Sequence, residues 1–129
     1  MFRRQHDVVL VDQRGTGQSN GLSIPREKTP QHYLSEMHPV DYVREMRHAL
    51  EQRADLTKYT TSTAMDDLDD VRAWLGYDKI NLFGLSYGTR AALVYMRQHP
   101  DHVRSVILMG VADRFENAVA SFRGGSARN

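Results

Sequence analysis

Residues 79–92 are K-I-N-L-F-G-L-S-Y-G-T-R-A-A, and this stretch decides the fold. The segment Lys79–Phe83 predicts a strand and is followed by a glycine. A helix is predicted from Ser86 to about Gln98, because Pro100 cannot continue it. A second strand is predicted over Arg104–Met109. Strand, helix and strand in this order predict parallel pairing through a right-handed crossover.

The junction between strand and helix is Gly84-Leu85-Ser86-Tyr87-Gly88, which satisfies G-x-S-x-G in its required strand–turn–helix context. A chain that reverses so tightly strains the serine backbone and needs small neighbours. We therefore expect Gly84 and Gly88 to let strand and helix approach closely. Ser86 is the predicted nucleophile, and the Tyr87 N–H is the predicted oxyanion donor, worth about 10²–10³ in rate. The alternative is a serine that only caps the helix.

The rest of the chain predicts an α/β fold, with a mostly parallel sheet of about three strands flanked by helices. Residues 7–12 form a continuous apolar run, V-V-L-V between two aspartates, and predict a further strand that ends at the turn R-G-T-G of residues 14–17. A long loop covers 18–38. Helices are expected from Pro39 to about Arg53, from the hydroxyl-rich 59–63 segment to Leu75, and over 113–122. We expect one truncated core over 1–122 and a disordered tail over 123–129.

Four aspartates lie near the start of the helix that follows the hydroxyl cluster: Asp66, Asp67, Asp69 and Asp70. They could hold a metal ion, but their spacing is not that of a calcium loop. Carboxylates in this place complement the helix dipole. We therefore expect solvated charges, no metal and no cofactor.

Composition limits the partners of the chain. The formal net charge is +1, from 17 Lys and Arg against 16 Asp and Glu, which favours neither nucleic acid nor an anionic membrane. The absence of cysteine excludes disulfides and thiolate metal sites. No signal-peptide core follows Met1, and from this we expect a cytoplasmic location.

Three segments together resemble the proline iminopeptidase and tripeptidyl aminopeptidase group of α/β-hydrolases: V-D-Q-R-G-T-G-Q-S at 11–19, Y-T-T at 59–61 and G-L-S-Y-G-T-R at 84–90. The resemblance implies a partial α/β-hydrolase fold, a Ser-Asp-His mechanism, and peptide or ester substrates. It also implies the nucleophile role of Ser86 and the oxyanion role of Tyr87. Leu85 is a small departure, since that group often has glycine at this position.

The general base is the open question, because serine is a poor nucleophile without one. In the group that this chain resembles, the catalytic Asp and His come far beyond the elbow, whereas 43 residues follow Ser86 here. A helix of 12 residues would put His99 and His102 about 18 Å from the serine, so we expect surface histidines there. Asp113 is a candidate acid or a helix N-cap. His32 and His38, in the long loop, are candidate bases.

Two functions follow from this inventory. The first is acyl hydrolysis by Ser86. The alternative is a catalytically incomplete remnant that acts as an oligomerising or binding module. The resemblance implies a distant Asp and His, an H-G-G-P-G turn that helps to form the oxyanion hole, and a strand before that turn, and we find none of these in the sequence. An apolar strand edge left uncovered also favours association, so we expect a homo-oligomer.

Overall fold

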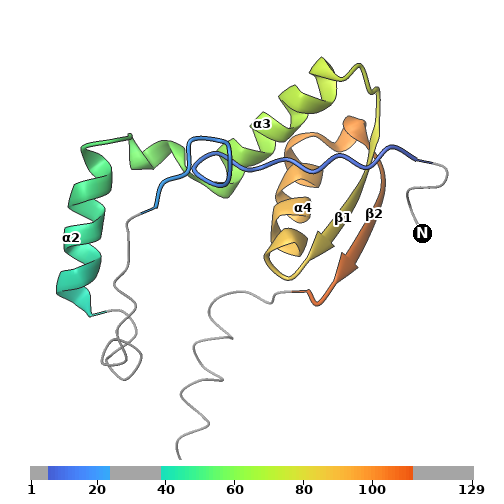
Figure 1. Cartoon of the computed structure of the whole chain (residues 1–129). Helices are drawn as coiled ribbons and strands as arrows, with labels where there is room; N and C mark the ends of the chain where they lie inside the picture. Colours follow the sequence, from blue (N-terminus) through green and yellow to red (C-terminus); the bar gives the residue numbers. More distant parts are fainter. Residues whose placement is uncertain (1–5, 24–38, 112–129) are drawn as a thin grey trace, which may run out of the picture. The chain divides into compact units, whose positions relative to one another are not determined.

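The structure, a computed structural model, describes residues 6–23 and 39–111 (Figure 1). The chain divides into two compact units, Met1–Ala64 and Met65–Asn129, which are described in turn. Several predictions lie outside the described residues: the helix over 113–122, the tail over 123–129, and the positions of His32, His38 and Asp113.

The strand expected at Asp7–Asp12 is wrong. The described residues contain one sheet, which has two strands rather than three and does not include this segment. Its apolar side chains are exposed, with Leu10 at 92%. An apolar, β-branched run favours a strand only where a neighbouring strand supplies hydrogen bonds and a packing surface.

The turn that follows is confirmed. Gly15 and Gly17 have positive φ values of 77° and 46°. The Gly15 N–H donates to the Ser19 carbonyl at 2.8 Å, and the Gln18 N–H donates to Asp12 Oδ2 at 2.8 Å. Arg14 Nη1 donates to the Lys58 carbonyl at 2.9 Å. The turn is thereby attached to a segment 44 residues away in the sequence.

Both helices expected between residues 39 and 75 are present. Helix α2 is Val40–Glu51, with Pro39 as N-cap, and a short 3₁₀ turn, η2, is Leu56–Lys58. Helix α3 is Thr61–Trp74 and continues into the second unit. The Thr63 N–H donates to Thr60 Oγ1 at 3.2 Å, so the hydroxyl cluster caps α3 as predicted.

The second unit contains the strand–helix–strand element in the predicted order: β1 (Ile80–Leu85), α4 (Tyr87–Gln98), η3 (Pro100–His102) and β2 (Val103–Met109). Strands β1 and β2 pair in parallel, as expected (Figure 1). Strand β1 runs two residues further than predicted and ends directly before Ser86.

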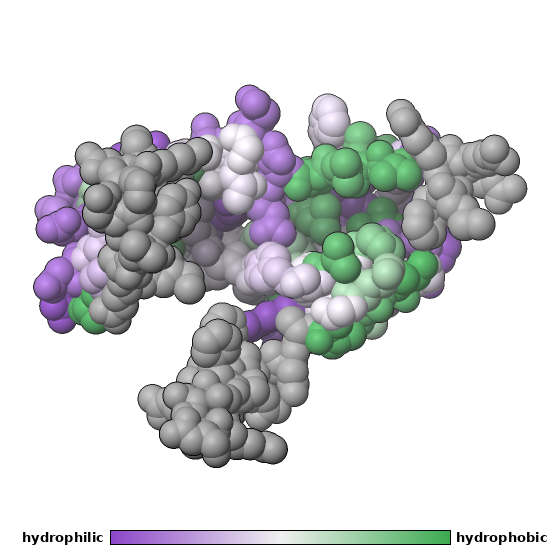
Figure 2. All heavy atoms as spheres, turned by 60° about the horizontal axis from the view of Figure 1, so that its bottom comes forward, coloured by the Kyte–Doolittle hydropathy of each residue, from purple (hydrophilic) through white to green (hydrophobic). Residues whose placement is uncertain are grey.

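The two faces of this sheet differ. Helix α4 packs against both strands and buries Thr89, Ala91, Ala92 and Tyr95. The opposite face exposes Phe83 beside Ile107 and Leu85 beside Met109. Figure 2 shows hydrophobic side chains at the surface of this unit. No helix among the described residues is both long and apolar enough to cross a bilayer.

Candidate active site

Ser86 stands between the last residue of β1 and the first of α4, in a backbone conformation that non-glycine residues rarely adopt. Its φ is 51° and its ψ is −116°. Such a conformation costs about 1–3 kcal/mol and persists only where the surrounding structure enforces it. The side chain is exposed. The strained, solvent-facing serine is the arrangement expected of a nucleophile elbow.

Hydrogen bonds fix this conformation from both sides. The Ser86 N–H donates to the Met109 carbonyl at the end of β2, at 3.0 Å. The Ser86 carbonyl accepts the Thr89 N–H at 2.9 Å and the Thr89 hydroxyl at 2.7 Å. Thr89 is fully buried. One residue of β2 and one turn of α4 therefore hold the serine backbone in place.

The close approach of strand and helix falls on Gly84. A Cβ there would lie 2.5 Å from the Gly88 carbonyl oxygen and 2.9 Å from the Thr89 nitrogen, so no side chain fits. A Cβ on Gly88 would meet no atom within 4 Å. The tight packing therefore depends on one glycine of the pair.

The Ser86 hydroxyl lies at the carboxyl edge of the parallel strands and beside the N-terminus of α4. Tyr87 is the first residue of α4, and its side chain is about half exposed. Backbone N–H groups in the first turn of a helix point toward its N-terminal end. This geometry can accommodate an acyl carbonyl next to Ser86 and stabilise negative charge on its oxygen.

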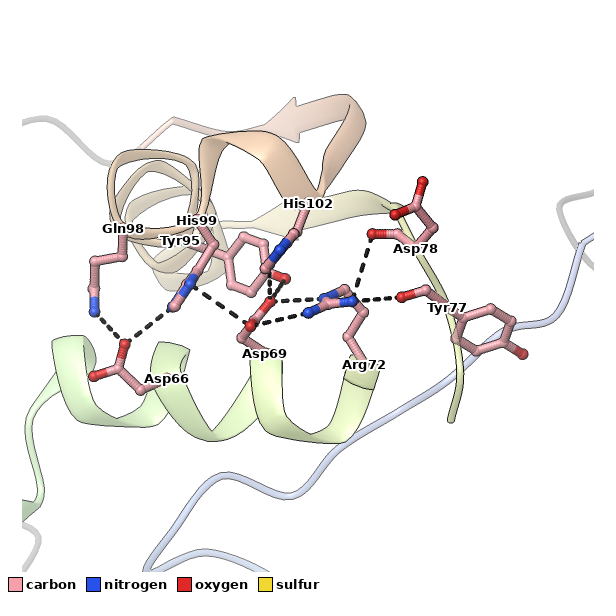
Figure 3. Close-up of polar contacts among 9 residues, drawn as sticks. All are labelled: Asp66, Asp69, Arg72, Tyr77, Asp78, Tyr95, Gln98, His99 and His102. Carbon is pink, nitrogen blue, oxygen red and sulfur yellow. Dashed lines mark hydrogen bonds and ion pairs between the residues drawn. The ribbon is translucent and has the colours of Figure 1, made fainter. Parts of the chain in front are cut away.

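A second polar cluster centres on Asp69 of α3, at the opposite end of α4 from Ser86 (Figure 3). Arg72 donates from Nε to Asp69 Oδ1 at 2.8 Å and from Nη2 to Oδ2 at 3.1 Å. The Tyr95 hydroxyl and His102 Nδ1 each lie 2.7 Å from Oδ1. Arg72 also donates to the carbonyl of Tyr77, at 2.5 Å. The cluster ties α3 to α4, to η3 and to the segment before β1.

Charge and burial shift the pKa values of Asp69 and Tyr95 in this cluster. The Arg72 guanidinium, helped by the Tyr95 and His102 hydrogen bonds, holds the pKa of Asp69 well below its usual range, against the opposing effect of burial. Burial, together with the Asp69 carboxylate, raises the pKa of Tyr95 well above its usual range. At neutral pH the pair is therefore a carboxylate that accepts a hydrogen bond from a phenol.

The expectation that the aspartates of α3 are solvated charges is wrong for Asp69, whose side chain is only 15% exposed. His99 and His102 are not bare surface histidines either, since their side chains are 20% and 37% exposed and both contact aspartates. The 12 residues of α4, a rise of about 18 Å, separate both from Ser86. Arg72, three residues after Asp69 on one helix, was the sequence signal for a fixed carboxylate.

Comparison with known proteins agrees with the fold. The family profile described as alpha/beta hydrolase fold matches residues 2–124, which is nearly the whole chain. This chain belongs to the α/β-hydrolase fold family. The partial fold of this class predicted from the sequence is thereby confirmed.

The curated relatives are peptidases. The chain is 30% identical over 105 residues to a probable proline iminopeptidase of Streptomyces coelicolor, covering 81% of this chain and 24% of that protein. It is 32% identical over 122 residues to the tripeptidyl aminopeptidase of Streptomyces lividans, covering 85% and 23%. The serine protease Hip1 of Mycobacterium tuberculosis is 31% identical over 121 residues, covering 83% and 23%.

The chain thus spans about a quarter of the length of these relatives. No solved structure matches the chain significantly. The resemblance to the iminopeptidase and aminopeptidase group, predicted from the three sequence segments, is confirmed.

Proposed function

We propose that this protein is a serine hydrolase that cleaves peptide or ester substrates through Ser86. One observation carries the proposal: Ser86 occupies the strained turn between a parallel strand and a helix, at φ 51°, in a chain of the α/β-hydrolase family. A serine that only capped α4 would need no such strain. Ser86 also makes no side-chain cap hydrogen bond in the structure.

The proposed reaction has two steps. Ser86 Oγ attacks the substrate carbonyl carbon and gives its proton to a general base, while the Tyr87 N–H donates to the developing oxyanion. The amine or alcohol leaves with that proton and an acyl-serine remains. Water then attacks the acyl-serine, releases the acid and restores the serine hydroxyl. The relatives named above act on peptides by name, which supports peptides as the substrate class.

For the general base we propose His32 or His38, with Asp113 as the candidate acidic partner. The support is one of position in the sequence: both histidines fall within the loop that the sequence predicts over 18–38, and Asp113 follows β2. Single replacements by Ala separate the three. Loss of turnover in one histidine variant, with the other unaffected, would identify the base, and full activity in all three would remove this part of the proposal.

Hydrolysis of aminoacyl p-nitroanilides and p-nitrophenyl esters tests the proposed function. The wild-type chain should release nitroaniline or nitrophenol with saturable kinetics, and Ser86→Ala should fall to the uncatalysed background. The matched control is Ser105→Ala, because Ser105 is an exposed serine on β2 whose hydroxyl donates to Asn81 at 2.7 Å. Turnover that survives in Ser86→Ala would contradict the proposal.

We also propose that the chain forms a homo-oligomer through its exposed sheet. The outer face of β1 and β2 exposes Phe83 by 54%, Leu85 by 62%, Ile107 by 45% and Met109 by 51%. The register places these side chains in two adjacent pairs, which form one apolar surface. A second copy of the chain would present the same surface and bury both.

Light scattering coupled to size exclusion tests this association. A dimer or larger species is expected, and Leu85→Lys should shift it toward the monomer, while Leu93→Lys, an exposed leucine on α4, should not. A monodisperse wild-type monomer at working concentration would contradict the idea.

A further inference from the structure

The Asp69 cluster contains a set of metal-ligand groups that the elbow chemistry does not use. Asp69 of α3, His99 at the end of α4 and His102 of η3 each offer one ligand atom, and these atoms all lie within 4.8 Å of one another (Figure 3). All three side chains are partly exposed, so an ion and its waters can reach them. The two histidines are three residues apart, and the fold brings them to Asp69, which lies about 30 residues earlier on α3.

We propose that Asp69, His99 and His102 bind a divalent transition-metal ion, with Zn²⁺ as the best match. Two imidazole nitrogens and one carboxylate oxygen are ligands that Zn²⁺ takes readily, and a water would complete a tetrahedral site. Ca²⁺ and Mg²⁺ prefer oxygen ligands and do not suit two histidines. The site lies at the other end of α4 from Ser86 and is distinct from the proposed hydrolase chemistry.

The hydrogen bond on the far side of His99 orients its ring for this role. His99 Nε2 lies 3.0 Å from Asp66 Oδ1, which also accepts from Gln98 Nε2 at 2.7 Å. A carboxylate only accepts, so Nε2 carries the hydrogen, and in the neutral ring Nδ1 carries the lone pair. A ligating histidine that donates its other N–H to a carboxylate is the common outer-shell arrangement of zinc sites.

The lone pair of His99 Nδ1 faces Asp69 Oδ2 across 3.7 Å. That distance is too long for a hydrogen bond. It is shorter than two metal–ligand bonds laid end to end, which for Zn²⁺ with N and O total about 4.0–4.3 Å. The gap therefore fits an ion bound to both atoms.

The other two groups adapt with little movement. His102 Nδ1 donates to Asp69 Oδ1 at 2.7 Å, and to bind the ion it gives up this bond, since the neutral imidazole can carry its hydrogen on Nε2 instead. Asp69 Oδ1 keeps its bonds to Arg72 Nε and to Tyr95, while Oδ2 accepts from Arg72 Nη2 and has a second lone pair for the ion. These two partners hold the carboxylate in the orientation that the ion would need.

Isothermal titration of the full chain with ZnCl₂ tests the proposal, in buffers of different ionisation enthalpy. We expect about one ion per chain. His99→Ala and His102→Ala should abolish binding. Asp66→Ala, which removes only the outer-shell partner, should weaken it about 10–100-fold. The matched controls are Asp70→Ala, an exposed aspartate of α3, and His48→Ala on α2, and both should bind as wild type.

Histidine side-chain NMR of the wild-type chain needs no variant and guards against misfolding. Zn²⁺ should shift or broaden the ring signals of His99 and His102 and leave those of His48 unchanged. No binding up to millimolar Zn²⁺, ring shifts confined to other histidines, or unchanged affinity in folded His99→Ala would each overturn the proposal.

Discussion

Gly84→Ala should destabilise the protein because the added methyl has no space. Its Cβ would lie 2.5 Å from the Gly88 carbonyl oxygen, 2.7 Å from the Gly88 carbonyl carbon and 2.9 Å from the Thr89 nitrogen. These are backbone atoms of the first turn of α4, which cannot rotate away as a flexible side chain can. Overpacking of this kind costs about 1–3 kcal/mol, and here it also pushes α4 away from β1.

Gly88→Ala is the matched control, with the same chemical change four residues later. No atom lies within 4 Å of the added Cβ, and Gly88 is inside α4, where alanine is favoured over glycine by about 0.5–1 kcal/mol. The two variants should therefore change the free energy of unfolding in opposite directions, with a difference of about 1.5–4 kcal/mol between them.

Urea denaturation at 25 °C measures this difference, with equal m-values required for the comparison. Far-UV circular dichroism is the better probe, because the single tryptophan, Trp74, is already 84% exposed and will report little change. If Gly84→Ala is as stable as Gly88→Ala, the close contact between β1 and α4 at the elbow does not exist as described, and the strain on Ser86 loses its structural cause.

Three further variants test the bonds around Asp69 and Ser86, all in metal-free buffer with EDTA. Asp69→Asn should lower the free energy of unfolding at pH 7 by about 1.5–3 kcal/mol, as expected for hydrogen bonds to a charged group. The folded-state pKa of Asp69 is depressed, so the ionised carboxylate stabilises the folded state above the ordinary aspartate pKa, and this stabilisation is lost as pH falls below about 4. The free energy of unfolding of Asp69→Asn, measured by urea titration, should therefore depend less on pH in the acid range than that of wild type. The folded-state pKa of Tyr95 is raised, so the protonated hydroxyl stabilises the folded state below the ordinary tyrosine pKa, and this stabilisation is lost as pH rises above about 10. Tyr95→Phe should therefore lose less stability than wild type as pH rises above about 10. Thr89→Val, which removes the hydroxyl bond to the Ser86 carbonyl, should cost about 1 kcal/mol by thermal unfolding. Equal pH profiles for wild type and the two cluster variants would contradict the pKa assignments, and an unchanged melting temperature for Thr89→Val would contradict that bond's role.

The sequence predicted the elbow and its neighbours because their determinants are local. The strand ending at Leu85, the glycine at position 84 and the helix ending before Pro100 each depend on residues a few positions apart. Parallel pairing followed from the order of the elements, since a helix between two strands of one sheet forces it. The family followed from short motifs that carry this local geometry.

The features that were missed depend on distant partners. The apolar run at 7–12 has the composition of a strand, but composition does not supply the neighbouring strand on which pairing depends. Asp69 was assigned to solvent because its charge fits a helix start, yet Tyr95 and His102, 26 and 33 residues away, make it a fixed acceptor. Arg72 on the same helix was the one signal in the sequence, and the contacts that Asp69 makes with α4 and η3 appear only in the structure.

Labelling with a fluorophosphonate probe, with mass mapping of the modified residue, tests the central claim most directly. An activated serine attacks the phosphorus, and an ordinary exposed serine does not. We predict stoichiometric labelling at Ser86, none in Ser86→Ala, and wild-type labelling in Ser105→Ala. A folded, monodisperse wild-type sample that takes up no probe, or takes it up equally in Ser86→Ala, would contradict the assignment of Ser86 as the nucleophile of a hydrolase.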